Sequence, residues 1–308
     1  MSTPTSAGTS VPASGCAAAS LTGYLVSISY VSYVASANLV SVQPDDPHRP
    51  ALDVQAVQAG LAGSPWRLEV VDESPSTNAS VAARARAGEP VGLVLVAEHQ
   101  SAGRGRLGRS WVTPPRTALT VSWLVAPERV PIARWPWLPL LTGLAVVEAV
   151  REVSGLAVQL KWPNDVLFAD RKVAGILAER IERPDGAVAV VGVGLNVSST
   201  RDDLPVPTAT SLALEGRPDV DRGALLVALL SSFGRWYDRW LTGGGEGLRG
   251  PYLAACSTLG RDVRVDLPAG ESLTGVAEDV DDSGRLLVRD RTGLHPLGAG
   301  DVVHVRPG

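Results

Sequence analysis

The strongest constraint on the fold is a regular alternation of strand-like and helix-like apolar segments that begins at residue 66. After residue 257 only short strand-like segments follow, separated by Gly and Asp-Ser-Gly turns. We predict strands at residues 67–71, 91–97, 118–124, 158–162, 166–168, 172–181, 188–193, 263–267, 272–280, 286–289 and 302–305, and helices at 77–87, 138–153 and 221–241. The pattern therefore predicts an α+β chain with a mixed sheet, followed by a small barrel-like β module.

These changes in the pattern of apolar and polar residues predict three parts of the chain, residues 1–65, 66–257 and 258–308. The first part has no charged side chain before residue 45, and Arg49 is its only basic residue. A secretory signal needs a basic segment at its start, and the many serines argue against a transmembrane helix. We expect a low-charge, partly disordered extension, or a start codon placed too far upstream, with one short helix at 51–62. A membrane-associated helix is the alternative.

Composition narrows the function classes. Hydrophobic residues make up 45% of the 308 residues and charged residues 19%, which provides a sizeable core and excludes wholesale disorder. The formal net charge of −4 argues against a chain that mainly coats nucleic acid. With two cysteines, a disulfide framework or a Cys-based zinc site is not indicated, so we expect a cytoplasmic protein.

Lysine and asparagine are unusually scarce. Of 28 basic residues only Lys161 and Lys172 are lysines, and the chain has four asparagines. Both lysines, with Asn164 and Asn196, fall between residues 161 and 196. Because a composition so rich in Arg replaces Lys wherever Arg suffices, these positions are candidates for a specific chemical demand.

The most informative segment is the Gly/Arg loop GRGRLGRSW at residues 103–111. Its glycines leave the backbone free to move, while Arg104, Arg106 and Arg109 are permanent planar cations suited to phosphate or carboxylate oxygens. We predict a lid that orders on a polyphosphate. The alternatives are a solvated loop or an RGG-like nucleic-acid segment, which the position between two apolar strands in an acidic protein disfavours.

A second segment combines KWPND at residues 161–165 with KVAGIL at 172–177. Pro163 interrupts a strand ladder, so Asn164 and Asp165 are expected at strand ends, where an ordinary surface turn is the alternative. A carboxylate there is suited to Mg²⁺, and a lysine ammonium to a phosphoryl group during displacement. Gly175 would let a ligand lie against the strand backbone.

Two further segments are weaker alone. Ser76-Thr77-Asn78 begins a helix and predicts either a simple N-cap or hydrogen bonds to a small polar ring. GVGLN at 192–196 ends a strand with two glycines, which allows close approach of a flat ligand. Gln100 directly precedes the Gly/Arg loop and is expected at the same cavity.

Taken in order, STN, GRGRLGRSW, KWPND, KVAGILAE and GVGLN resemble the biotin–protein ligases, over roughly residue 66 to the C-terminus. The resemblance implies a catalytic domain like that of class II aminoacyl-tRNA synthetases and biotin ligases, and an SH3-like β-barrel domain after it. It implies that biotin and Mg-ATP form biotinyl-5′-adenylate and pyrophosphate. A lysine of a biotin carboxyl carrier domain then takes the biotin.

The resemblance also implies residue roles, carried over motif by motif. Biotin contacts fall on Ser76, Thr77, Asn78, Gln100, Arg104, Gly105, Arg106, Lys172 and Gly175. ATP and adenylate contacts fall on Arg104, Arg106, Arg109, Trp111, Lys161, Asn164 and Asn196, with Lys172, Arg106 and Lys161 as catalytic residues and Asp165 as a Mg²⁺ ligand. Leu107 stands where some members carry another Arg, so this loop has one cation fewer than the richest versions.

Several alternatives remain at the level of sequence. A DNA-binding repressor is disfavoured, because one basic residue in the first 65 cannot neutralise several phosphates. A lipoate or octanoate ligase shares the catalytic architecture but not the GRGRLGRSW and KWPND segments. A binding module without transfer activity is the non-enzyme alternative. We expect a monomer or weak homodimer without stable membrane association.

Overall fold

The computed structural model describes residues 49–243, 245–267 and 270–305. The predicted extension therefore lies mostly outside the described residues, apart from its last part, where the predicted short helix is α1 (Val54–Gly60). Within the described residues no helix is long and apolar enough to cross a membrane.

The centre of the protein is a seven-stranded sheet in the order β1-β2-β3-β7-β6-β5-β4. Its strands are β1 (Arg67–Ser74), β2 (Leu93–Gln100), β3 (Ala118–Val125), β4 (Gln159–Lys161), β5 (Asp165–Phe168), β6 (Arg171–Ile181) and β7 (Val188–Asn196). Only the β1–β2 pair is parallel, and the other neighbours are antiparallel. The predicted mixed sheet is confirmed.

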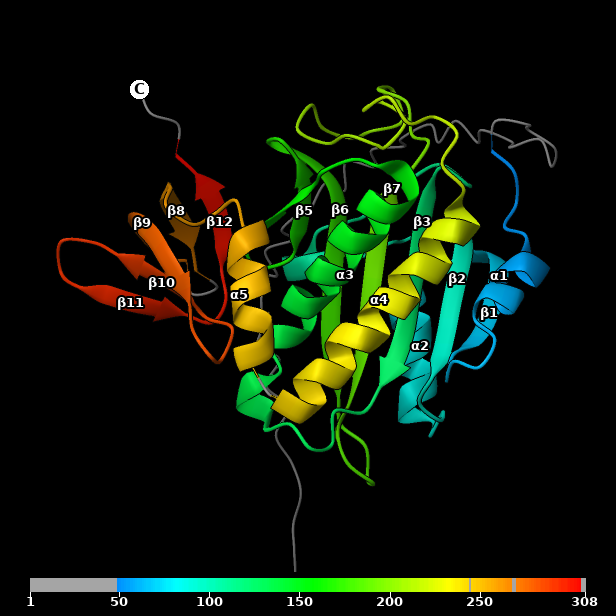
Figure 1. The fold of residues 1–308 in the computed structure, drawn as a ribbon, viewed down its shortest axis with the longest axis horizontal. Helices are drawn as coiled ribbons and strands as arrows, with labels where there is room; N and C mark the ends of the chain where they lie inside the picture. The colour runs from blue at the N-terminus through cyan, green and yellow to red at the C-terminus, as the bar shows by residue number, and fades with distance from the viewer. Residues whose placement is uncertain (1–48, 244, 268–269, 306–308) are drawn as a thin grey trace, which may run out of the picture. The chain divides into compact units, whose positions relative to one another are not determined.

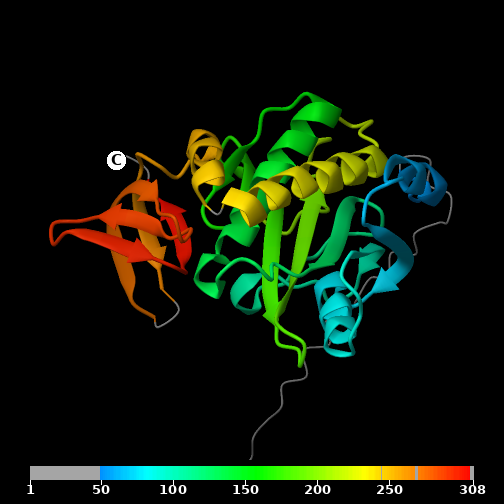
Figure 2. The ribbon, with the colours of Figure 1, turned by 60° about the horizontal axis from the view of Figure 1, so that its bottom comes forward.

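Both faces of this sheet are apolar, because alternate residues of each strand point to opposite sides. In β2, Val94 and Val96 belong to the large core that includes α3 (Trp137–Ser154) and α4 (Arg222–Gly243), while Leu93 and Leu95 pack with α2 (Thr77–Arg86). Figures 1 and 2 show α3 and α4 crossing one face of the sheet. The other face carries α2 and leaves room beside it for a site.

Sequence signals explain where the main helices begin and end. Ser76 caps α2 by accepting a hydrogen bond from the Ala79 N–H, and Asp221 accepts one from the Gly223 N–H at the start of α4. Gly155 ends α3 in the left-handed region, with φ 71°. These boundaries agree with the predicted ones to within two residues.

One helix was not predicted. The chain forms α5 (Glu246–Ala255), although three consecutive glycines precede it and Pro251 lies inside it. Leu248 and Tyr252, four residues apart on one face, are buried in the core. This packing outweighs the local signals for a helix end.

After α5 the chain forms a second, antiparallel sheet of five strands in the order β11-β10-β9-β8-β12. The strands are β8 (Asp262–Asp266), β9 (Ser272–Val280), β10 (Leu286–Arg289), β11 (Leu294–Leu297) and β12 (Asp301–His304). The predicted β module is confirmed, with β11 as an additional strand. Its pairing leaves β11 and β12 as the two ends, so over the described residues the sheet is open rather than a closed barrel.

Candidate active site

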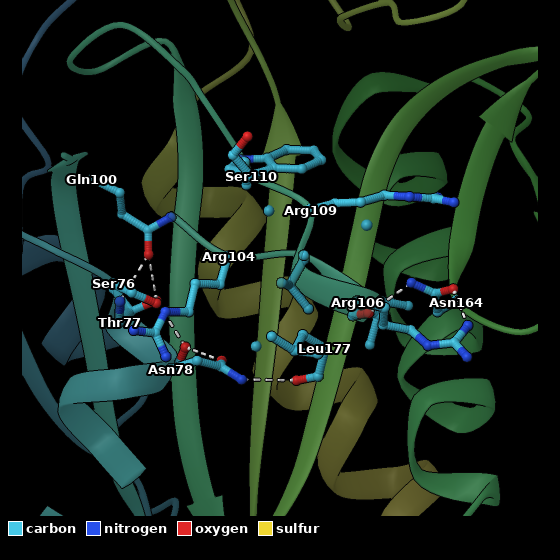
Figure 3. Close-up of a pocket in the computed structure, with 18 of the residues that line it drawn as sticks. Ser76, Thr77, Asn78, Gln100, Arg104, Arg106, Arg109, Ser110, Asn164 and Leu177 are labelled. Carbon is cyan, nitrogen blue, oxygen red and sulfur yellow. Dashed lines mark hydrogen bonds between the residues drawn. The ribbon is translucent and has the colours of Figure 1, made fainter. Parts of the chain in front are cut away.

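A cavity opens on the α2 face of the central sheet, between the start of α2, the Gly/Arg loop and the β4–β5 hairpin (Figure 3). It gathers thirteen of the fifteen predicted site residues. They are Ser76, Thr77, Asn78, Gln100, Arg104, Gly105, Arg106, Arg109, Trp111, Asn164, Asp165, Lys172 and Gly175. Segments far apart in the sequence therefore form one site; Asn78 and Leu177, for example, are 99 residues apart and share a direct hydrogen bond.

One end of the cavity is a network of buried, uncharged polar side chains that the carboxylate of Glu179 joins from β6. Thr77 donates from its backbone N–H and its hydroxyl to Gln100 Oε1, at 2.8 and 3.0 Å. Ser122 Oγ lies 2.8 Å from Thr77 Oγ1 and 2.6 Å from Asn78 Oδ1. The Asn78 amide donates to Glu179 Oε2 at 2.8 Å. Because each side chain is fixed by another, this wall is rigid and its remaining lone pairs and protons face the cavity in set directions.

Ser122 and Glu179 were not predicted from the sequence. Ser122 is fully buried in the middle of the apolar strand β3. A hydroxyl at such a position requires a partner, since a buried polar group without one is costly. This signal in the sequence identifies Ser122 as a candidate; Glu179, on a strand with mixed burial, gives no comparable signal.

The floor of the cavity is glycine backbone. Gly175 on β6 pairs with Gly194 on β7, and Gly192 lies two residues further along β7. A Cβ atom at Gly192 would lie 1.9 Å from Asn78 Oδ1, and one at Gly194 would lie 2.5 Å from the Trp111 ring. A side chain at either position would clash with these groups, so glycine is what lets Asn78 and Trp111 pack directly against the β7 backbone.

The Gly/Arg loop forms a small hairpin over the cavity. The Trp111 N–H donates to Gly103 O at 2.8 Å, and the Gly105 N–H donates to Arg109 O at 2.6 Å. At the turn, Leu107 has φ 54° and is followed by Gly108 with φ 74°. A left-handed pair at the tip turns the hairpin back on itself and leaves the Leu107 side chain exposed.

The loop contacts both the β4–β5 hairpin and the C-terminal sheet. Arg106 donates to Asn164 Oδ1 at 2.9 Å and to Gly300 O at 3.4 Å. Arg109 forms an ion pair with Asp301. The C-terminal sheet thus supplies a residue of the cavity, Asp301, that the sequence motifs did not identify.

The other end of the cavity is cationic. Lys172 Nζ lies 2.6 Å from Asp165 Oδ1 and 5.7 Å from the centre of the Trp111 ring. Burial lowers the pKa of Arg106, opposed by Asp165 and reinforced by Arg109. A partly desolvated cation such as Arg106, close to Arg109 and Lys172, is stabilised when an anion reaches it.

Two predicted residues lie outside this cavity. Lys161 lines an adjoining cavity that shares Arg109, Asp165 and Lys172 with the first. It also includes Arg261, which directly precedes β8, and His304 on β12. Burial lowers the pKa of Lys161, and burial together with Lys161 and Arg261 lowers the pKa of His304 to about 4. The second cavity thus combines four cationic side chains with three carboxylates, Asp165, Asp170 and Asp262, and Lys161 is its desolvated cation.

Asn196, the other residue outside the main cavity, is buried, and its amide donates to Thr210 O at 2.9 Å. It lies two residues beyond Gly194 on β7. The backbone of Thr210 in turn donates to Lys172 O at 2.8 Å. Asn196 thus fixes the segment that runs beside Lys172.

A metal site built from protein groups alone is not present: over the residues that the structure describes, three or more His, Cys, Asp or Glu side chains never gather in a way that could hold a metal. The two carboxylates of the main cavity, Asp165 and Asp301, are each paired with a cation. This donor set fits a Mg²⁺ ion that arrives bound to phosphate oxygens and takes at most one or two carboxylates from the protein.

Comparison with known proteins agrees with this combination of mixed sheet, Gly/Arg loop and C-terminal β module. The biotin/lipoate A/B protein ligase family matches residues 70–196, and the biotin protein ligase C-terminal domain matches residues 258–305. A solved structure of biotin protein ligase from Aquifex aeolicus in complex with biotin and ATP superimposes with a TM-score of 0.67 at 28% identity, covering 78% of this chain and 99% of that one.

Sequence relatives narrow the class. The biotin–[acetyl-CoA-carboxylase] ligase of Mycobacterium tuberculosis is 42% identical over 265 residues, which are 84% of this chain and 97% of the relative. The bifunctional ligase/repressor BirA of Bacillus subtilis is 30% identical over 69% of this chain and 66% of its own length. The chain belongs to the biotin protein ligase family.

Proposed function

We propose that the protein is a biotin–protein ligase that activates biotin with Mg-ATP and transfers it to a lysine of a biotin carboxyl carrier domain, as in the acetyl-CoA-carboxylase ligases it resembles. The observation that carries the proposal is the polarity of the cavity. One end offers fixed neutral hydrogen-bonding groups, the floor contains three glycines, and the other end offers cationic side chains, of which Arg106 is partly desolvated. A small ligand with a neutral polar ring and a carboxylate tail matches this arrangement, with the ring at the neutral end and the carboxylate at the cationic end.

The neutral end is assigned to the ureido ring of biotin. Ser76, Thr77, Asn78 and Gln100 line it, and Ser122 fixes two of them. Gly175, whose backbone lies beside Lys172 and Trp111, is assigned to contact with the flat ring system. The biotin carboxylate would lie at the cationic end. Between the two ends the cavity is lined by Arg104, Gly105, Arg106 and Lys172.

Adenylation then takes place at the cationic end. A carboxylate oxygen of biotin attacks the α-phosphorus of ATP, and the bond to the oxygen that bridges the α- and β-phosphorus breaks, so that pyrophosphate leaves with the electron pair. Arg106 and Lys172 stabilise the charge on the α-phosphoryl group, and Lys161 stabilises the β- and γ-phosphates in the adjoining cavity. Asp165 would exchange its contact with Lys172 for the Mg²⁺ carried by ATP.

The remaining groups are assigned to the nucleotide. The Trp111 ring packs against Gly194 and is assigned to the adenine, with Asn196 two residues further along the same strand. Arg109 and Asn164 flank the phosphate end. In the second step the acceptor lysine amine attacks the carbonyl carbon of the adenylate and AMP leaves. The Gly/Arg hairpin excludes water from this reactive anhydride until then.

Several features of the proposal concern the whole protein. Residues 66–257 are assigned to the catalytic domain and 258–308 to the C-terminal domain, with 1–65 as an extension. The partner is a carrier domain of a biotin-dependent carboxylase in the cytoplasm, and the protein acts as a monomer or weak homodimer. DNA binding is not proposed, because Arg49 is the only basic residue among the first 65.

The second candidate is a lipoate or octanoate ligase, since the matched family includes lipoate ligases. Biotin is favoured by the neutral hydrogen-bonding end of the cavity, because its polar ring can pair with the lone pairs and protons that the network leaves free, whereas the apolar body of lipoate or octanoate cannot. ATP–pyrophosphate exchange with biotin, lipoate and octanoate offered separately tests this. Exchange with biotin alone is expected; exchange with lipoate or octanoate instead would change the substrate, and exchange with none would favour a binding module.

A further inference from the structure

A buried ion pair lies at the base of the Gly/Arg loop, outside both cavities. Glu98 and Arg222 are 6% and 7% exposed, and Arg222 Nη1 lies 2.6 Å from Glu98 Oε2. Glu98 stands on β2, two residues before Gln100, and Arg222 is the first residue of α4. Neither residue contacts the proposed ligands, so the adenylation step does not explain why a charged pair is buried here.

This ion pair holds a third element, residues 49–53, which we call the N-terminal strap. Glu98 Oε1 accepts a hydrogen bond from the Leu52 N–H at 2.7 Å, and Arg222 Nη2 donates to Pro50 O at 2.6 Å. Arg49 adds an ion pair with Asp203 at 2.9 Å. Each charged side chain thus divides its hydrogen bonds between its partner and the strap.

The backbone of Glu98 and the side chain of Arg222 also hold the segments that precede and follow the Gly/Arg loop. On the outgoing side Glu98 lies on β2, whose last residue, Gln100, binds Thr77 in the cavity wall. On the returning side the Arg116 N–H donates to Glu98 O at 2.7 Å, and Arg222 Nη1 donates to Ala118 O at 3.3 Å. The loop can close over a ligand only with the geometry that these two ends allow.

We propose that Glu98 is a positioning residue for the Gly/Arg loop, and that the N-terminal strap and Arg222 lock it in place. Removal of one partner of a buried ion pair leaves the other charge uncompensated, so the base of the loop would relax. Closure of the loop therefore depends on the strap, which precedes the catalytic domain. Because closure retains the adenylate, adenylate retention depends on the strap as well. This inference rests on the proposed function, because adenylate retention is its readout.

The test compares Glu98→Gln with Glu148→Gln in the full chain. Glu148 joins α3 to α4 through Ser232 and the exposed Arg235, away from both cavities, and controls for the loss of a carboxylate ion pair elsewhere in the chain; the free energy of unfolding of both variants is measured so that a difference in general stability is recognised. Biotinyl-adenylate is formed on the enzyme with pyrophosphatase present and no carrier, and its release after gel filtration is followed together with the KM for biotin. Biotin-dependent ATP–pyrophosphate exchange by the wild-type protein is measured first. Its absence would contradict the proposed function rather than this inference.

We expect Glu98→Gln to release adenylate at least about tenfold faster, as the loss of a buried charge partner implies, while Glu148→Gln stays within about twofold of wild type. Wild-type retention in Glu98→Gln, or equal acceleration in both variants, would overturn the proposal. If Glu98→Gln does not fold, Leu52→Pro is compared with Leu52→Ala. Both remove the side chain, but only proline removes the N–H that binds Glu98, so faster release from Leu52→Pro supports the proposal and equal release contradicts it.

Discussion

The two ends of the main cavity are built in opposite ways. At the neutral end, Thr77, Asn78, Gln100 and Ser122 are all buried and bind one another before any ligand arrives. At the cationic end, the charges are balanced by side chains that a substrate would replace, as Asp165 balances Lys172. A preformed end selects a ligand by shape and hydrogen bonding at little reorganisation cost, whereas an end held by exchangeable ion pairs responds to the charge of the ligand.

This contrast predicts that the largest loss comes from the cationic end. Lys172→Ala should reduce biotin-dependent ATP–pyrophosphate exchange by about 10²–10³-fold, because the charge it stabilises develops during displacement. Arg171→Ala is the matched control, since Arg171 is next in sequence but pairs with Glu215 outside the cavity. Near-normal exchange in Lys172→Ala, with folding verified by circular dichroism, would contradict the assignment.

The Gly/Arg hairpin should show a smaller and different effect. Arg106→Ala removes the charged hydrogen bond to Asn164 and the contact with Gly300, so the hairpin should open more readily. At about 1.5–3 kcal/mol for a charged hydrogen bond, free biotinyl-adenylate should be released on the order of tenfold faster or more. Quantifying adenylate in the filtrate of a spun reaction measures this, and unchanged retention would show that the hairpin does not act as a lid.

A substitution at the neutral end should affect one substrate only. Ser122→Ala leaves Asn78 Oδ1 without the hydroxyl that lies 2.6 Å away, which costs about 1–3 kcal/mol for a buried group. We expect the KM for biotin to rise about tenfold while the KM for ATP stays unchanged. Ser154→Ala, which removes a buried hydroxyl at the end of α3, is the control and should leave both constants unchanged. Equal increases for both substrates would show that the two ends are not independent.

The same contrast explains what the sequence predicts well. Lys172, the Gly/Arg loop and the helix start at Ser76 carry local signals, because rare residue types, glycines and a capping hydroxyl mark their positions directly. The alternating apolar segments give the strands of the central sheet, since the period of two reflects its two buried faces. These features depend on residues close together in the chain.

Features that depend on distant contacts were not predicted. Asp301 joins the cavity because the C-terminal sheet contacts the hairpin, and α5 forms because Leu248 and Tyr252 find a core that outweighs Pro251. Likewise, the sequence predicts Lys161 beside Asp165 but not that it lines a separate cavity with Arg261. A strand pattern also does not determine whether five strands close into a barrel.

The smallest predicted effect concerns His304, at the cationic side of the second cavity. Its pKa is lowered to about 4 by burial and by Lys161 and Arg261, so the folded state binds a proton less readily than the unfolded chain. The free energy of unfolding should therefore be fully retained above about pH 6.5 and fall as the pH decreases towards 4. Because His304 is half-buried, we expect a contribution of only about 1 kcal/mol after solvent screening. Urea unfolding of the wild type and of His304→Gln between pH 7 and 4 measures this contribution. The free energy of unfolding of the variant should fall less as the pH decreases. An equal fall in both proteins would show that the pKa of His304 is not lowered by its surroundings in the second cavity.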